Sequence, residues 1–124
     1  MKNRRLLRIA LLAAAVMGVA LSCGLDYTLD FELGDTGVIG STVEVDYTLT
    51  NQGSRAMDNT TLTIRVSCLV DDLPQTMELY TPPVDLFVGQ SESGTLTFTF
   101  TGSAATEVWV EVVGAGWDEH VSGE

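Results

Sequence analysis

The sequence predicts an all-β protein, namely a single immunoglobulin-like antiparallel β-sandwich of about seven strands after an N-terminal signal peptide. Apolar and polar residues alternate through several short segments, which is the period of a half-buried strand. Turn-forming residues separate these segments at intervals of about ten residues. No segment of the mature chain repeats its apolar residues at helical spacing. A small closed barrel is the alternative, because its strands alternate in the same way.

The first half of the mature chain contains the clearest strands. Residues 25–33 alternate between apolar side chains and Asp, Thr or Glu, and residues 43–50 repeat this pattern before a turn at 51–54. The longest predicted strand follows, and its apolar face consists of Leu62, Ile64, Val66, Cys68 and Val70. We expect the two sheets to share one core that includes Tyr47, Ile64, Val66, Phe98 and Val110.

Shorter elements follow the longest strand. The aspartates at 71–72 predict a hairpin turn into a weaker strand near 76–80, and the prolines at 82–83 end that strand. Residues 89–94 supply another turn, after which residues 95–101 alternate between threonine and apolar side chains. These elements are sufficient to complete two sheets.

The last predicted strand carries the candidate contact residues. It covers residues 107–113, and 114–116 (Gly-Ala-Gly) is interpreted as the opening of a short polar C-terminal tail. Period-two alternation places Trp109 and Val113 on the outward face, where neighbouring strands display threonine and acids. We expect other atoms to shield an outward-facing indole from water, either those of the tail through Trp117 or those of another molecule. We therefore predict Trp109, Val113 and Trp117 as partner or ligand contacts.

The N-terminus has the composition of a secretory signal peptide. Four basic residues lie within the first eight, and the apolar run from Ile9 to Leu21 contains 13 residues. A membrane-spanning helix needs about 20 residues, so this run fits the core of a signal peptide. We assign residues 1–22 to the signal peptide and residues 23–124 to the sandwich with its tail.

The end of the signal peptide resembles a bacterial lipobox. Residues 19–23 read Val-Ala-Leu-Ser-Cys, with apolar and small residues before the cysteine. The resemblance implies cleavage before Cys23 and attachment of lipid to its thiol, and hence a membrane contact through the lipid anchor. Because Gly24 and not an aspartate follows, it also implies the cell envelope, with the outer membrane favoured in a diderm organism. Ordinary secretion with cleavage near the same place is the alternative.

The mature chain is strongly acidic. All 17 Asp and Glu residues follow Cys23, where only Arg55 and Arg65 oppose them. Nucleic acid is excluded as a partner, because phosphate contacts require a basic patch. Such acidity keeps a small domain soluble.

Three segments resemble bacterial CARDB-type immunoglobulin-like domains. Residues 41–53 look like the strand of that family that ends in Asn-x-Gly, and residues 62–72 look like the next strand with its Asp turn. Residues 88–91 followed by 95–101 look like a Gly-x-Ser element and its alternating strand. The resemblance implies the fold and an adhesion or spacer role, and it offers no catalytic residues.

The residue types needed for catalysis are sparse. If Cys23 carries lipid, Cys68 has no intramolecular partner, and its place on an apolar strand face predicts a buried, reduced thiol. His120 is the only histidine, whereas zinc would need three or four His or Cys ligands. A serine triad would need a Gly-x-Ser-x-Gly elbow, which the chain lacks, and a histidine outside the tail. Calcium is the alternative with most support, but acids at alternate strand positions lie about 6.6 Å apart. We predict no enzyme, no catalytic residue, no metal site and no cofactor.

Three classes of function follow from these features. The first is a noncatalytic, lipid-anchored envelope protein whose domain contacts other envelope proteins, as an adhesion element or an accessory subunit. The second is a small-ligand or carbohydrate-binding module, with a glycan held by Trp109 and Trp117. The third, an enzyme, has the least support.

Overall fold

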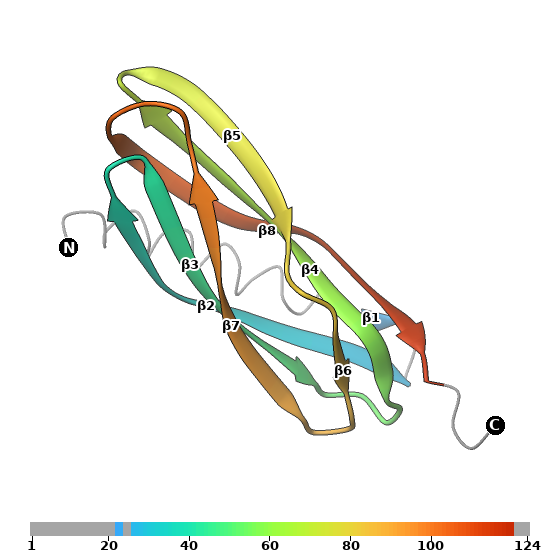
Figure 1. Cartoon of the computed structure of the whole chain (residues 1–124). Helices are drawn as coiled ribbons and strands as arrows, with labels where there is room; N and C mark the ends of the chain where they lie inside the picture. The colour runs from blue at the N-terminus through green and yellow to red at the C-terminus, as the bar shows by residue number, and fades with distance from the viewer. Residues whose placement is uncertain (1–21, 24–25, 121–124) are drawn as a thin grey trace.

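The computed structural model describes residues 22–23 and 26–120, which form two antiparallel sheets packed face to face (Figure 1). The strands are β1 (Ser22–Cys23), β2 (Tyr27–Ile39), β3 (Thr42–Asn51), β4 (Met57–Val70), β5 (Leu73–Tyr80), β6 (Val84–Leu86), β7 (Ser91–Thr99) and β8 (Ala105–Glu119). The predicted all-β sandwich is confirmed. The signal peptide assigned to residues 1–22 falls almost wholly outside the described residues. Within the described part, no helix is long and apolar enough to cross a membrane.

Each sheet is built around one long central strand. The first sheet has the order β1-β2-β3-β7. In the second, β8 pairs with β4 along nearly its whole length, so β5 and β6 share the other edge of β4. The β3–β4, β6–β7 and β7–β8 connections cross between the sheets, and β7 and β8 are edge strands that pair with β3 and β4. This arrangement matches the immunoglobulin-like prediction.

The core lies between the two sheets and follows the alternation of the strands. Every second residue of β3 and β4 is buried, as period-two side-chain geometry requires. The five predicted core residues are all buried, namely Tyr47, Ile64, Val66, Phe98 and Val110. Their burial confirms the inward faces of β3, β4, β7 and β8.

The last strand is longer than predicted. It continues through 114–116 to Glu119 and pairs with β4 throughout, so the tail predicted from residue 114 is wrong. The glycines Gly114 and Gly116 lie opposite Thr63 and Thr61. Strand β4 is long enough to supply the pairing partner, which overrides the turn preference of the Gly-Ala-Gly segment.

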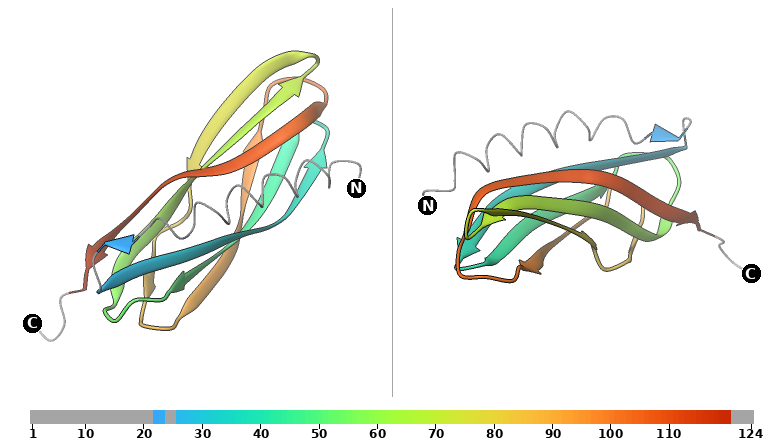
Figure 2. Two further views of the ribbon diagram at one scale, coloured as in Figure 1. Left: turned by 180° about the vertical axis from the view of Figure 1, so that it is seen from behind. Right: turned by 90° about the horizontal axis from the view of Figure 1, so that it is seen from above.

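The two ends of the sandwich differ in what they carry. One end, called here the Cys23 end, brings together Cys23, Asp26 and residues 51–55, 85–90 and 118–120. Figure 2 shows in both views that β1 and the end of β8 lie at this same end. The opposite end, called the tip end, consists of the hairpin turns near 39–41 and 71–73 and the 100–104 connection.

Backbone hydrogen bonds join the three connections of the tip end. Phe100 N donates to Ser41 O at 2.9 Å, and Ala105 N donates to Gly40 O at 2.8 Å. Asp71 N donates to Ala104 O, and Asp71 Oδ2 accepts from Ser103 N at 3.0 Å. The tip end is therefore one fixed surface.

Candidate contact site

The outer face of the second sheet is organised around one arginine. Arg65 lies on β4 directly between Glu78 on β5 and Glu111 on β8 in the strand register. Its Nε donates to Glu78 Oε2 at 2.8 Å, and its Nη1 donates to Glu111 Oε1 at 3.1 Å. The hydrogen bond that Arg65 donates to Glu78 is the largest cause that raises the pKa of Arg65. Three strands are thus connected across the face by charged pairs.

The indole of Trp109 is attached to this charged row. Trp109 lies on β8 opposite Ser67, and its Nε1 donates to Glu111 Oε2 at 3.0 Å. Glu111 therefore binds Arg65 with one oxygen and Trp109 with the other. The side chain is partly exposed, whereas its neighbours Val108 and Val110 are buried. The structure thus places Trp109 outward, as the alternation predicts, and fixes its orientation.

Val113 lies at an irregular point of the same strand. The register of β8 on β4 shifts between the pairs Thr63–Gly114 and Ile64–Val112, so Val113 is the extra residue of a β-bulge. It is partly exposed. The bulge reverses the alternation for every residue of β8 that follows.

Trp117 does not pack against Trp109, so the prediction that the C-terminal tail covers Trp109 through Trp117 is wrong. Because of the bulge, Trp117 packs against the core and against Tyr27, with ring centroids 6.1 Å apart. Eight strand residues separate the two tryptophans, which corresponds to about 26 Å. The two indoles belong to opposite faces of the sheet, so they cannot form one aromatic site.

Tyr27 connects the start of the domain to its last strand. Its hydroxyl donates to Glu119 Oε1 at 3.1 Å, and the guanidinium carbon of Arg55 lies 5.7 Å from its ring centroid. Burial is the largest cause that raises the pKa of the Tyr27 hydroxyl, followed by its bond to Glu119. Cys23, the predicted lipid attachment site, pairs with Tyr27 in the β1–β2 ladder. The predicted attachment point therefore lies directly on the folded domain.

Asn51 organises the loops of the Cys23 end. This fully buried residue donates through Nδ2 to the carbonyls of Arg55 and Leu86, at 2.8 and 3.0 Å, and accepts at Oδ1 from Gly53 N at 2.9 Å. A side chain at Gly53 would collide with the backbone of Asp26 and Thr28. These contacts explain why an Asn-x-Gly sequence ends β3.

The residues considered for catalysis lie apart. Cys68 is a free, buried cysteine, and burial raises the pKa of its thiol. Its burial is as predicted, and a raised pKa disfavours the reactive thiolate. His120 contacts Asp58 at 3.1 Å and the ring of Phe87 at the Cys23 end. Ten residues of β4 separate Asp58 from Cys68, which corresponds to about 33 Å.

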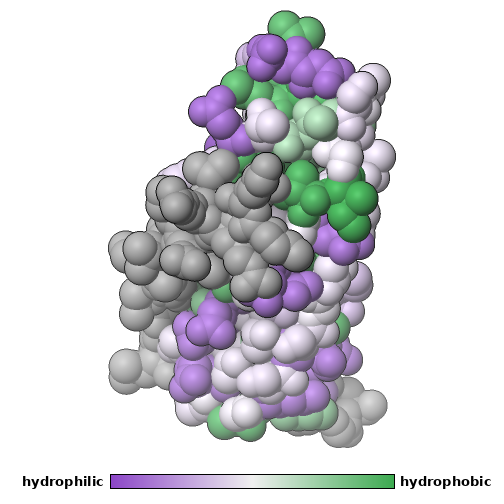
Figure 3. All heavy atoms as spheres, turned by 90° about the vertical axis from the view of Figure 1, so that its left-hand side faces the viewer, coloured by the Kyte–Doolittle hydropathy of each residue, from purple (hydrophilic) through white to green (hydrophobic). Residues whose placement is uncertain are grey.

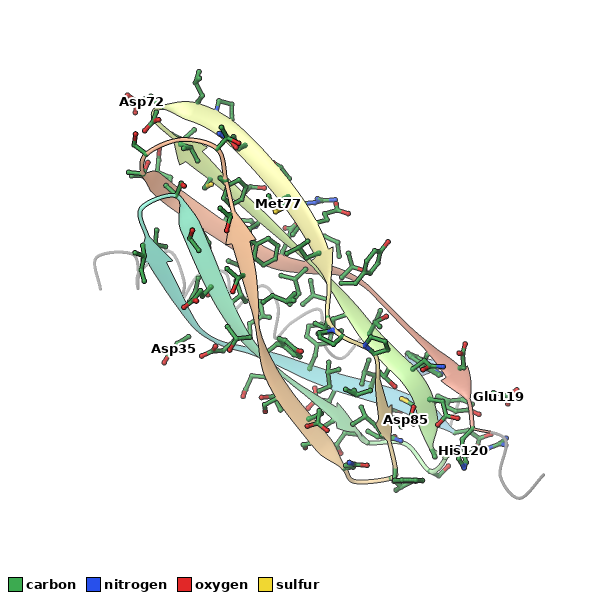
Figure 4. The ribbon with its side chains drawn as sticks, viewed as in Figure 1. Asp35, Asp72, Met77, Asp85, Glu119 and His120 are labelled. Carbon is green, nitrogen blue, oxygen red and sulfur yellow. The ribbon has the colours of Figure 1, made fainter. Side chains whose placement is uncertain are left out.

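Metal ligands do not gather in the described part of the chain, where no group of three His, Cys, Asp or Glu side chains could hold an ion. Figure 4 shows Asp85, Glu119 and His120 at one end and Asp72 at the other.

Sequence reasoning missed Arg65, Glu111 and Asn51 as organising residues. Arg65 is one of only two Lys or Arg residues after Cys23, and this rarity among many acids could have indicated that it forms ion pairs. The Asn-x-Gly sequence indicated a turn at Asn51, but the bond from Asn51 to the carbonyl of Leu86 joins residues 35 positions apart and could not be predicted from it.

Comparison with known proteins found similarity to solved structures but not to families or curated sequences. No protein-family model matches the chain, and no curated protein matches it. The trimeric lipoprotein SadB of Salmonella enterica is similar in structure, with a TM-score of 0.46 and 12% sequence identity. The match covers 74% of this chain and 55% of that chain, so this chain spans about half the length of that protein. The CARDB-type resemblance is not confirmed by a family match and stays a prediction.

Proposed function

We propose that the chain is an exported envelope protein, anchored by lipid at Cys23, whose immunoglobulin-like domain makes noncatalytic contacts with another envelope protein. The contact surface is the outer face of the second sheet around Trp109. The observation that carries this proposal is the hydrogen bond from Trp109 to Glu111, because it holds a large aromatic side chain ready on a face of the molecule.

Support for the contact surface comes from its preorganisation. Buried aromatic residues and arginine contribute most of the binding energy of many protein interfaces. Here an indole and a guanidinium share one carboxylate, so neither side chain needs to be ordered when a partner binds. A surface that is ordered in advance loses less conformational entropy on binding.

Support for the anchor comes from the sequence before Cys23 and from the position of that residue. The basic and apolar segments that end at the cysteine resemble a lipoprotein signal, and the first long strand begins at Tyr27. Cys23 pairs with Tyr27 in the β1–β2 ladder, so it lies directly on the folded domain. A lipid on Cys23 would hold the domain against the membrane. We propose the cell envelope as the location, and the outer membrane in a diderm organism.

The noncatalytic role is supported by the environments of the candidate reactive groups. The Cys68 thiol is buried, and the His120 ring contacts Asp58 and Phe87 at the Cys23 end. The His120–Asp58 pair lies about 33 Å along β4 from Cys68, so the histidine cannot activate the thiol. No step of acyl or phosphoryl transfer can be assigned to such an arrangement.

Crosslinking in cells tests the protein contact. A photocrosslinking amino acid at Thr76, which lies on β5 across Ser67 from Trp109, should capture a discrete partner that mass spectrometry identifies. Trp109→Ala should abolish capture, whereas Thr97→Ala on the outer face of the first sheet should not. Equal capture in both variants would show that the contact lies elsewhere.

A glycan is the second candidate ligand, and the same geometry favours it. Sugars stack on exposed aromatic rings, accept hydrogen bonds from arginine and donate hydrogen bonds to carboxylates. Trp109 has Arg65 and Glu78 beside it on the same face. A glycan array probed with the isolated domain tests this candidate, and binding that Trp109→Ala removes would favour a glycan over a protein partner.

A further inference from the structure

The β6–β7 turn exposes two neighbouring apolar side chains at the Cys23 end. Phe87 is 59% exposed and Val88 is 56% exposed, although they directly follow the fully buried Leu86. A contiguous exposed apolar patch can mark a contact with another molecule or with a membrane.

Hydrogen bonds keep this turn in one conformation. Phe87 N donates to Gln90 Oε1 and Gln90 N donates to Phe87 O, both at 2.9 Å. Gly89 has a φ of 80°, which a residue with a side chain would adopt only with strain, and its N donates to Asn51 O at 2.9 Å. The two apolar side chains are therefore displayed by a rigid support.

The turn lies at the same end of the sandwich as Cys23. Phe87 contacts the ring of His120 edge-on, with centroids 5.9 Å apart, and the adjacent Glu119 accepts a hydrogen bond from Tyr27, the partner of Cys23 in the β1–β2 ladder. The three residues from Cys23 to Asp26 can span at most about 11 Å. A lipid on Cys23 would bring this end of the domain, and no other, to the membrane surface.

The carboxylates of this end are paired, which lowers the cost of placing them near lipid. Asp26 and Glu119 lie 4.0 and 3.9 Å from Arg55. Three further carboxylates nearby have hydrogen-bond partners. Asp58 contacts His120, and Asn59 donates hydrogen bonds to Asp85 and Asp118. The end still carries net negative charge, which favours zwitterionic over anionic lipid.

We propose that Phe87 and Val88 enter the interface of the zwitterionic lipid layer that holds the lipid of Cys23, so that the domain has two contacts with the membrane. This inference rests on the proposed lipid attachment at Cys23. A second contact strengthens the attachment and fixes the orientation of the domain on the membrane. The tip end and Trp109 then point away from the membrane, with Trp109 about 33 Å along β8 from Glu119.

A fluorescent label on the lipidated protein tests the orientation. The full-length chain is processed in cells and purified from membranes, and its intact mass establishes whether Cys23 is acylated. The variants Val88→Cys and Leu73→Cys carry the label, since Leu73 is 67% exposed at the tip end and provides the matched control. Cys68 is buried and stays unlabelled in the native domain. Each labelled protein is reconstituted into phosphatidylcholine vesicles that contain a nitroxide quencher in the lipid.

The label at position 88 should shift its emission to the blue and be quenched, whereas the label at position 73 should behave as in water. A Phe87→Asp substitution should remove most of the quenching at position 88, and Ile39→Asp should leave it unchanged. An acylated protein whose label at position 88 emits as in water would overturn the orientation and leave the anchor intact. A protein without acyl mass at Cys23 would overturn the anchor itself and, with it, this inference.

Discussion

The side-chain amide of Asn51 donates a hydrogen bond to the carbonyl of Leu86 at 3.0 Å, and both residues are fully buried. This bond joins the last residue of β3 to the last residue of β6, and so connects the two sheets at the Cys23 end. The backbone of Asn51 extends the connection, because its carbonyl accepts from Gly89 N and its N–H donates to Gln90 O. One residue thus fixes the turn that displays Phe87 and Val88.

Asn51→Ala should destabilise the domain by about 3 kcal/mol, because the carbonyl of Leu86 and the neighbouring loop groups lose their buried partner. Urea unfolding followed by circular dichroism measures this change. Gln52→Ala, at the exposed adjacent position, is the control and should stay within about 0.5 kcal/mol of the parent. A small effect at both positions would mean that water replaces the Asn51 bonds.

Val66→Ala should cost about 2 kcal/mol, because it removes two methyl groups from a fully buried position between the sheets. Ser67→Ala, one residue along β4 on the outer face, should change stability by less than about 0.5 kcal/mol. The same unfolding measurement compares the two. An equal loss at both residues would contradict the assigned facing of β4.

Trp117→Ala should destabilise more than Trp109→Ala, by about 2 kcal/mol against at most about 1 kcal/mol. The reason is that Trp117 packs on the core and on Tyr27, while Trp109 lies on the outer face. Fluorescence of the variant that retains only Trp109 should be red-shifted relative to the variant that retains only Trp117. The reverse order of stabilities or of emission would contradict the bulge at Val113.

Cys68 should resist thiol reagents in the native protein and react once the domain is unfolded, because it is 5% exposed. Rapid stoichiometric labelling without denaturant would show that β4 opens or faces the other way.

The raised pKa of Cys68 also predicts a pH dependence of stability. Above the ordinary thiol pKa of 9.0 the unfolded chain loses its proton first, since burial holds the folded thiol neutral. The unfolded state then binds fewer protons, so the free energy of unfolding should fall as the pH rises above 9.0, until the folded thiol ionises too. Cys68→Ala should lack this part of the decline. Tyr27 and Tyr47, whose pKa values are also raised, contribute the same tendency at higher pH in both proteins.

Period-two alternation predicted the sandwich because burial of one sheet face imposes that pattern directly. It placed Val66, Cys68 and Trp109 on the correct faces. It failed after Val113, since a bulge adds one residue and reverses the facing. Gly114 is the local signal of this bulge, because a glycine inside a strand often marks one. Gly114 and Gly116 were interpreted as a turn, although pairing with the long β4 keeps them in a strand.

The contact site was predictable only in part. Trp109 could be singled out because an indole is unusual on a face of threonines and acids. Its attachment to Arg65 through Glu111 depends on the register of β4 with β8, which is a long-range property. Exposed apolar residues at the tip end, Ile39 and Leu73, were likewise not singled out. Figure 3 shows apolar patches toward that upper end of the molecule.

Attachment of this domain to the membrane through Cys23 can be measured by the intact mass of the mature protein purified from cell membranes. We expect a chain that begins at Cys23 and carries acyl mass, and a Cys23→Ala variant that moves to the soluble fraction. An unmodified mature N-terminus at Gly24 or later, in protein that still sediments with membranes, would contradict it.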